Sequence, residues 1–276
     1  MSLTVGLVQF TAGDDPAVNC EALQRYVNKA ADGGARFVLT PEVSNIISSS
    51  RSHQQRVLHR QEDDPTLKAL AALAKAREIH LLIGSLALKS DGDRFLNRSF
   101  LISPTGKIIA HYDKIHMFDV ALGGGESYRE SAQFQPGNRA VLAETDIGKI
   151  GLTICYDLRF PHLHRALAQA GAEILTAPAA FTVPTGKAHW HTLLKARAIE
   201  TGCFILAPAM VGQHSPKRAT YGHSLVVSPW GEVLADGGTA EGVTFATFDL
   251  SLVKEARAKI PALNHDREFT LDHAHQ

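Results

Sequence analysis

The chain has 276 residues, of which 45% are hydrophobic and 20% are charged, so it is long enough to bury a substantial core. Its 28 lysines and arginines are balanced by 28 aspartates and glutamates. Because the formal net charge is zero, the composition disfavours nucleic acid or an anionic membrane surface as a partner.

Cysteine usage indicates a reducing compartment. Cys20, Cys155 and Cys203 are an odd number of cysteines spaced far apart, which argues against a disulfide framework. The first residues lack a basic region followed by an apolar one, and no apolar stretch approaches the ~20 residues of a membrane span. We therefore expect a soluble, cytoplasmic protein without a signal peptide or a membrane partner.

The first part of the chain alternates strands and helices. An Asp-Pro pair at 15–16 supplies the start of a helix that ends at the glycine pair 33–34, and a second Asp-Pro pair at 64–65 opens another helix. Apolar residues follow each start at helical spacing. Strands are expected at residues 4–10, 36–39, 80–88, 95–102 and 107–112.

The second half repeats this order of elements. Segment 99–110 resembles segment 224–235, and both contain Ser-Pro-x-Gly, which predicts a hairpin turn in each. Helices are expected at 161–170 and 186–201, and strands at 149–154, 173–177, 203–209, 223–228, 232–236 and 243–248.

Two similar α/β halves can each cover one face of a sheet with helices and bury the other face against the partner half. The sequence therefore predicts an α/β fold, a four-layer α-β-β-α sandwich in a single domain over residues 1–276, with a C-terminal tail from about 262 to 276. The stretches 43–63 and 116–138 are long and irregular, and we expect them to form the walls of a cleft.

A lone thiol stands where an apolar run meets a turn. Cys155 follows the predicted strand 149–154, at a position from which a side chain can reach both a cleft and backbone donors. Glu42, Lys114 and Glu130 also follow strands or lie in long loops. Taken singly, the cysteine fits a buried structural role and each charged residue fits an exposed surface position.

Together, these four residues carry a family pattern. Thr-Pro-Glu42, Tyr-Asp-Lys114-Ile-His, Glu130-Ser and Ile-Cys155-Tyr-Asp-Leu-Arg-Phe-Pro occur in the order that resembles the nitrilase (carbon–nitrogen hydrolase) superfamily. The resemblance implies the same four-layer fold. It also implies that Cys155 is the nucleophile, Glu42 its general base, Lys114 the stabiliser of the oxyanion, and Glu130 the residue that holds the lysine and helps to position substrate.

General chemistry supports these roles. A free thiol is only a few per cent ionised at neutral pH, so a neighbouring carboxylate is needed to take its proton. Burial is expected to raise the pKa of Glu42 toward the working pH. The Tyr156 N–H is a second candidate oxyanion donor, and Arg159, Ala179 and Phe181 are further candidates for oxyanion or substrate binding. The expected course is attack on an amide, loss of the amine, and hydrolysis of a Cys155 thioester.

Fourteen histidines are the main competing signal, because they include His162-x-His164 and His189-x-His191. A zinc hydrolase favours histidine pairs with a carboxylate in a supporting motif, and the sequence contains no His-Glu-x-x-His. Gly123-Gly124-Gly125 lacks the Gly-Lys-Ser/Thr ending of a phosphate loop. We therefore expect no metal and no cofactor.

Within the superfamily the chain is similar to the Nit branch. The stretches that carry this similarity are 188–190, 196–201 and 217–231, which includes Tyr221-Gly222-His223-Ser224. The resemblance implies that the substrate is deaminated glutathione, a 2-oxoglutaryl amide that would yield 2-oxoglutarate and Cys-Gly. An ω-amidase acting on 2-oxoglutaramate, or on another small amide, is the alternative.

Three arginines are candidates for binding a substrate carboxylate. Arg159, Arg197 or Arg218 could clamp a substrate carboxylate, although each is as well explained by a structural ion pair. Thr40 and Ser44-Asn45 depart from the family pattern around Glu42, so the pocket wall there differs from that of relatives. The family also implies homodimers, formed near the helix after Cys155. A catalytically silent, oligomeric scaffold is the alternative of another class.

Overall fold

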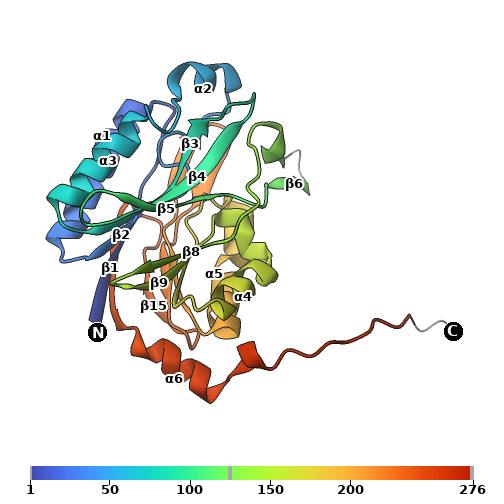
Figure 1. The fold of residues 1–276 in the computed structure, drawn as a ribbon. Helices are drawn as coiled ribbons and strands as arrows, with labels where there is room; N and C mark the ends of the chain where they lie inside the picture. Colours follow the sequence, from blue (N-terminus) through green and yellow to red (C-terminus); the bar gives the residue numbers. More distant parts are fainter. Residues whose placement is uncertain (1, 124–125, 274–276) are drawn as a thin grey trace.

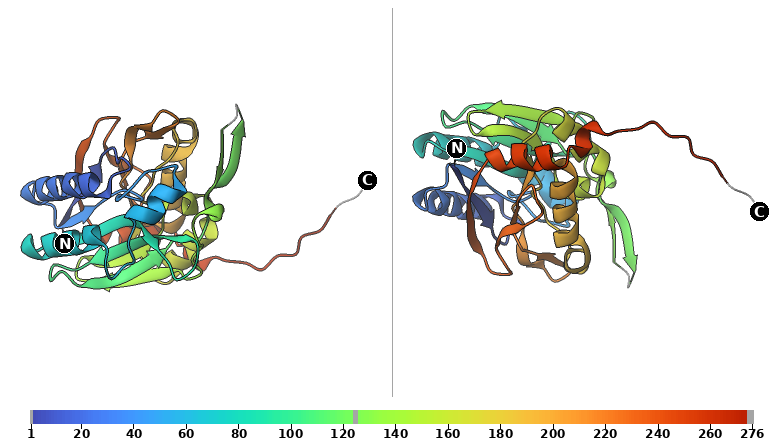
Figure 2. Two further views of the ribbon diagram at one scale, coloured as in Figure 1. Left: turned by 90° about the horizontal axis from the view of Figure 1, so that it is seen from above. Right: turned by 90° about the horizontal axis from the view of Figure 1, so that it is seen from below.

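In the computed structural model, which describes residues 2–123 and 126–273, two six-stranded sheets pack face to face between outer layers of helices (Figure 1 and Figure 2). The helices α1 (Pro16–Asp32) and α3 (Pro65–Ala76) cover the first sheet, and α4 (Pro161–Gln169) and α5 (Val183–Thr201) cover the second. The predicted α-β-β-α sandwich is confirmed.

The first sheet has the strand order β16-β1-β2-β3-β4-β5. Its strands β1 to β3 are parallel, as strand–helix–strand units require, and the remaining pairs are antiparallel. The bounds are β1 Ser2–Gln9, β2 Phe37–Leu39, β3 His80–Lys89, β4 Phe95–Ile102, β5 Ile108–Asp113 and β16 Gly242–Asp249.

The second sheet repeats that arrangement in the order β8-β9-β10-β11-β14-β15. Here β9 to β11 are parallel, and β8, β14 and β15 join them antiparallel. The bounds are β8 Val141–Thr145, β9 Gly148–Leu152, β10 Ile174–Thr176, β11 Phe204–Ala207, β14 Leu225–Val227 and β15 Val233–Asp236.

The internal likeness reaches the level of strand register. Leu101 pairs with Ala110 and Ile102 with Ile108 across the β4–β5 hairpin, and the matching residues of β14–β15 pair in the same way, with the same one-residue shift. Both turns close with a glycine at positive φ, 78° at Gly106 and 85° at Gly231. The Ser-Pro-x-Gly motif therefore specifies one bulged hairpin that is used twice.

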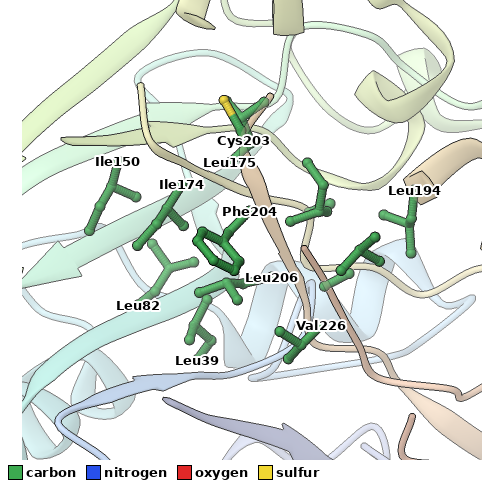
Figure 3. Close-up of a cluster of buried hydrophobic side chains, with 14 of the residues drawn as sticks. Leu39, Leu82, Ile150, Ile174, Leu175, Leu194, Cys203, Phe204, Leu206 and Val226 are labelled. Carbon is green, nitrogen blue, oxygen red and sulfur yellow. The ribbon is translucent and has the colours of Figure 1, made fainter. Parts of the chain in front are cut away.

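The core lies between the inner faces of the two sheets. Figure 3 shows the Phe204 ring packed among Ile174 and Leu206 of the second sheet, with Leu39 and Leu82 of the first sheet beside them. All five side chains are fully buried. Burial of a side chain of this size contributes roughly 1.5–3 kcal/mol relative to exposure, so this shared core holds the two halves together.

The predicted helix starts are confirmed by their caps. The Asp15 carboxylate accepts from the Ala17 N–H at 2.9 Å, and the Asp64 carboxylate accepts from the Leu67 N–H at 2.8 Å. The helix α5 begins three residues before its predicted start, at Val183.

The structure corrects several expectations. The last strand, β16, pairs with β1 in the first sheet, although it follows the second half in sequence; long-range pairing overrides chain order here. The strand β8 was not predicted. The stretch predicted to be irregular at 43–63 contains α2 (Arg51–Val57), and the stretch 116–138 contains β6 (Asp119–Gly123), β7 (Glu126–Arg129) and the 3₁₀ turn Glu130–Ala132. The unpredicted hairpin β12–β13 spans Val211–Ser215 and Arg218–Tyr221.

The end of the chain leaves the sandwich after α6 (Ser251–Lys259) and the short turn Ala262–Asn264. Residues 265–273 have no helix or strand. Asp266 accepts from Gln169 of α4 at 2.7 Å, and the chain beyond it runs away from the body (Figure 1). Residues 124–125 and 274–276 of the predicted loop and tail lie outside the described part. Within that part, no helix combines the length and the apolar character that crossing a membrane would require.

Candidate active site

A cavity of about 750 Å³ opens where β2, β5 and β9 end, and it contains all four residues of the predicted catalytic set. Glu42 follows β2, Lys114 follows β5, Cys155 follows β9, and Glu130 begins the 3₁₀ turn after β7. The fold therefore brings together residues that are up to 113 positions apart in sequence.

Lys114 is the centre of the charged cluster. Its Nζ lies 2.8 Å from Glu42 Oε1, and 2.9 and 2.8 Å from Glu130 Oε1 and Oε2. Only 2% of the lysine side chain is exposed. A buried ammonium is costly unless it is paired, and here two carboxylates pair with it, leaving this trio with one net negative charge.

Three further donors hold the carboxylates. The Asn97 side-chain amide donates to Glu42 Oε1 at 3.0 Å and to Glu130 Oε1 at 3.3 Å. The Ala180 N–H donates to Glu42 Oε2 at 3.0 Å, and the Phe118 N–H donates to Glu130 Oε2 at 2.6 Å. These bonds fix the orientation of both carboxylates before any substrate binds.

Sequence reasoning missed these donors. Asn97 carried a signal, because it shares the buried face of β4 with Phe95 and Ser99 and an amide is unusual on such a face. The Ala180 and Phe118 backbone donors carried no signal in their side chains.

Cys155 occupies a special backbone conformation. It is the first residue of the 3₁₀ turn Cys155–Arg159, its φ is +49°, and its N–H donates to the Pro178 carbonyl at 2.9 Å. A non-glycine residue at positive φ costs on the order of 1–3 kcal/mol, and such strain concentrates at functional positions. The turn directs the thiol into the cavity, where the Glu42 carboxylate is its neighbour.

The charges set the protonation of the cluster. Burial and the Glu42 carboxylate raise the pKa of Cys155 well above its usual value, although Lys114 opposes them. Burial would also raise the pKa of Glu42, but the Lys114 ammonium outweighs it and holds the pKa of Glu42 below its usual value. The expected upward shift of Glu42 is therefore wrong in direction. At neutral pH the resting site holds a neutral thiol beside an ionised carboxylate.

A buried carboxylate fastens the cysteine turn to the lysine segment. Asp157 accepts from the Ile154 N–H at 2.8 Å and from the His116 N–H at 3.0 Å. The His116 ring contributes a second contact, 2.7 Å from Nδ1 to Oδ1. Asp157 thus couples the position of Cys155 to that of Lys114, which lies two residues before His116.

One glycine allows the glutamate and cysteine loops to approach each other. A Cβ built on Gly84 would lie 2.0 Å from the Thr40 carbonyl oxygen, 2.5 Å from the Pro41 carbonyl oxygen and 2.5 Å from Pro178 Cβ. The first two residues lead into Glu42, and Pro178 accepts the hydrogen bond from the Cys155 N–H. A side chain at position 84 would therefore push these loops apart.

The secondary predictions have different outcomes. Tyr156 and Phe181 line the cavity. Ala179 does not, because its N–H donates to Pro208 and its carbonyl accepts from Met210, so it lies along the neighbouring chain segment. The next residue, Ala180, lines the cavity instead, and its N–H donates to Glu42.

The three arginines that were candidates for binding a substrate carboxylate differ in where they lie. Arg197 is buried and bonded to the Leu158 carbonyl and to Glu200, which makes it a structural support of the cysteine turn. Arg159 does not line the cavity, and its Nη2 lies 3.2 Å from His189 Nδ1. Arg218 is the one of the three that lines the cavity.

The two long stretches form cavity walls as expected. Residues 46–49 contribute one wall, and residues 127–130 and 133–134 contribute another. The aromatic rings of Phe118 and Tyr128 pack against each other there, with centroids 5.2 Å apart.

In the part of the chain that the structure describes, His191, His223 and Asp236 bring three potential metal-ligand atoms within 4.8 Å of one another. His191 Nε2 and His223 Nδ1 each lie 2.9 Å from a carboxylate oxygen of Asp236. None of these residues lines the cavity. Of the histidines that the sequence pattern singled out, His191 belongs to this cluster, whereas His162, His164 and His189 do not. The His164 ring contacts the Phe160 carbonyl.

Comparisons with known proteins show the family of the chain. A family model described as carbon–nitrogen hydrolase matches residues 4–258, which include all four residues of the catalytic set. The chain is 36% identical over 266 residues to a deaminated glutathione amidase of Yersinia enterocolitica, covering 95% of this chain and 92% of that protein.

Solved structures share the fold. The C. elegans NitFhit protein matches with a TM-score of 0.91 and 35% identity, covering 96% of this chain and 65% of that one. A mutant of the amidase from Nesterenkonia sp. AN1, in which acrylamide has undergone Michael addition at the active-site cysteine, matches with a TM-score of 0.79 and 25% identity over 94% of this chain and 98% of that one.

Proposed function

Because the chain belongs to the carbon–nitrogen hydrolase family, we propose that it is an amidase that hydrolyses a small carboxamide through a thioester on Cys155. The observation that carries the proposal is the contact of one buried ammonium, Lys114, with both Glu42 and Glu130 beside the thiol. The acrylamide adduct on the active-site cysteine of the Nesterenkonia amidase mutant shows that the cysteine of that related protein is reactive, which supports a reactive thiol here.

Acylation begins from the neutral thiol. As Cys155 Sγ bonds to the amide carbon, its proton passes to the Glu42 carboxylate, and the carbonyl electron pair moves onto oxygen. Lys114 and the Tyr156 N–H stabilise this oxyanion, a contribution of ~3–4 kcal/mol for one well-placed donor. Lys114 can exchange one of its two contacts with Glu130 for the oxyanion and still remain paired with both carboxylates.

Glu42 then returns the proton to the departing nitrogen. The carbon–nitrogen bond breaks, the amine leaves, and the acyl group remains on sulfur as a thioester. In deacylation Glu42 takes a proton from water, the water oxygen adds to the thioester carbon, and the carbon–sulfur bond breaks. Sulfur recovers the proton, and the acid leaves. The lowered pKa of Glu42 keeps it ionised and ready for both proton transfers.

Deaminated glutathione is the proposed substrate. Relatives such as the Yersinia enterocolitica enzyme carry that activity in their names, and they match nearly the whole chain. The cavity of about 750 Å³ lies within the range of small-molecule sites and has room for a tripeptide-sized amide. Hydrolysis would yield 2-oxoglutarate and Cys-Gly.

The test compares two amides that share the acyl group. We expect kcat/KM for deaminated glutathione to exceed that for 2-oxoglutaramate, because only the former fills the outer cavity with its leaving group. A preference for 2-oxoglutaramate would make the protein an ω-amidase, and turnover of neither amide, with no acyl group on Cys155, would favour the silent scaffold.

Assembly into a homodimer and a cytoplasmic location remain predictions from the sequence. Sedimentation velocity of the purified chain measures the first, and cell fractionation measures the second.

A further inference from the structure

Arg218 is placed at the cavity by a hairpin that is fastened to the active-site segment. It begins β13 and pairs with Ser215 across the turn, and both residues line the cavity. The hairpin is anchored where the Tyr221 N–H donates to the Phe181 carbonyl at 3.0 Å and where Thr220 bridges to Thr182. The hairpin that carries Arg218 is thus fixed to the active-site segment by backbone contacts.

Only some of the hydrogen-bond donors of the Arg218 guanidinium have an acceptor. Nη2 donates to the Ala180 carbonyl at 2.7 Å, and the Tyr128 ring lies 5.1 Å from Cζ. Nη1 is buried and has no hydrogen-bond partner. Buried donors are almost always paired, so the Arg218 guanidinium retains unused hydrogen-bonding capacity at the cavity wall.

Ala180 connects this guanidinium to the reacting groups. Its carbonyl accepts from Arg218, and its N–H donates to Glu42 Oε2 at 3.0 Å, so one residue separates the two side chains. In an extended 2-oxoglutaryl chain, four carbon–carbon bonds place the carboxylate about 5 Å from the amide carbon. Binding at Arg218 requires that a substrate with its amide carbon at Cys155 spans this separation with the far end of its acyl chain.

The charge of the cavity favours an anion at this end. Among the described residues that line it, four are cationic and two are acidic. Both acids, Glu42 and Glu130, are bonded to Lys114, so Arg218, Arg129 and Lys217 face the cavity without an acidic lining partner. Of these three, Arg218 is the one with a buried unpaired donor.

We propose that Arg218 binds the 2-oxo-acid carboxylate of the substrate's acyl chain and so selects amides of dicarboxylic 2-oxo acids. The inference rests on the proposed function and deepens it, because it assigns recognition of the substrate's acyl group to one residue. Both deaminated glutathione and 2-oxoglutaramate carry that carboxylate, so Arg218 acts on either substrate. The planar fork of arginine suits a carboxylate, whereas lysine offers a point charge.

The test measures binding of 2-oxoglutarate to the intact protein by calorimetry. We expect Arg218→Met to weaken binding about 50-fold and Arg218→Lys about 10-fold, as loss of charge-assisted hydrogen bonds predicts. Arg139→Met removes an exposed arginine outside the cavity and should leave binding within about twofold.

A second readout separates recognition from a merely structural role. The rate at which uncharged iodoacetamide alkylates Cys155 should be the same within about twofold in wild type and in Arg218→Met, because the thiol environment stays intact. Unchanged affinity for 2-oxoglutarate in Arg218→Met, a parallel loss of alkylation, or no binding by wild type would each overturn the inference. If Arg218→Met fails to fold, Arg218→Lys decides by the same criteria. Failure of the proposed function itself would appear separately, as absence of amide turnover by the wild-type protein.

Discussion

The Tyr112 hydroxyl donates a hydrogen bond to Asp157, with 2.7 Å between Oη and Oδ2, and both side chains are buried. Tyr112 lies two residues before Lys114, and Asp157 lies two residues after Cys155. With the His116 contacts to the other carboxylate oxygen, this bond joins the lysine segment to the nucleophile turn. We therefore expect the distance between the Cys155 thiol and the Lys114 ammonium to depend on a bond outside the cavity.

Removing that hydroxyl should loosen the site. Tyr112→Phe is expected to cost about 1–2 kcal/mol of unfolding free energy, because it deletes a buried hydrogen bond to a charged group. We expect kcat to fall roughly tenfold with a smaller change in KM, since the catalytic groups are misplaced rather than removed.

Tyr26→Phe is the matched control for this change. Tyr26 also donates to a carboxylate, Glu241 at 2.8 Å, but on the exposed side of the molecule. It should change stability by less than ~0.5 kcal/mol and leave turnover unchanged. Full turnover in Tyr112→Phe would show that the Asp157 link does not position the site.

The protonation of the cysteine depends on the neighbouring base. Because the Glu42 carboxylate raises the pKa of Cys155 and Lys114 lowers it, Glu42→Gln should lower that pKa while abolishing hydrolysis. Thiolate absorbance near 240 nm, taken as the difference from Cys155→Ala, should appear at lower pH in Glu42→Gln than in wild type. An unchanged or higher transition would show that Glu42 does not control the thiol.

Because its neighbours approach so closely, we expect position 84 not to tolerate a side chain. Gly84→Ala should destabilise the protein by roughly 2–4 kcal/mol, because the new methyl group meets the carbonyls of Thr40 and Pro41, which must move. Turnover should fall with it, since Glu42 follows directly. Gly92→Ala is the control, because its nearest neighbour would be Ser90 Oγ at 3.8 Å. Chemical denaturation and turnover measured on both variants decide the point.

Because His164 is buried, we expect the free energy of unfolding to fall at acid pH. Burial lowers the pKa of His164 from 6.5 to about 4, so the folded protein keeps it neutral while the unfolded chain takes up a proton below pH 6.5. Stability is full above pH 6.5 and is lost as the pH falls toward 4, by about 3 kcal/mol from this group.

The variant His164→Leu should lack this component. Unfolding free energies at pH 7.5 and pH 4.5 should differ less in the variant than in wild type. Equal pH dependence of the two proteins would assign the acid sensitivity to other groups.

Much of the fold could be predicted from the sequence because short local motifs indicate its helices, strands and turns. Asp-Pro helix starts, Ser-Pro-x-Gly turns and apolar periods identified most elements, and the repeated order of elements predicted the sandwich. Glu42, Lys114 and Cys155 were predicted as site residues because each polar side chain follows a strand within a family pattern, and the structure brings them into one cavity.

The remaining features depend on distant partners. Pairing of β16 with β1 and of Asn97 with two carboxylates is decided by the folded chain rather than by neighbouring residues. The direction of the Glu42 shift was misjudged because burial and the Lys114 charge act in opposite senses, and only the 2.8 Å contact shows which dominates. Ala180 contributes through its backbone, to which its side chain gives no clue.

The central claim is that Cys155 carries the acyl group during turnover. Wild-type protein mixed with deaminated glutathione and quenched in acid within milliseconds should show, by mass spectrometry, one added 2-oxoglutaryl group on the peptide that contains Cys155. The variant Cys155→Ala should show no adduct and no hydrolysis. Hydrolysis at the wild-type rate by Cys155→Ala, or an acyl group on another residue, would contradict the account.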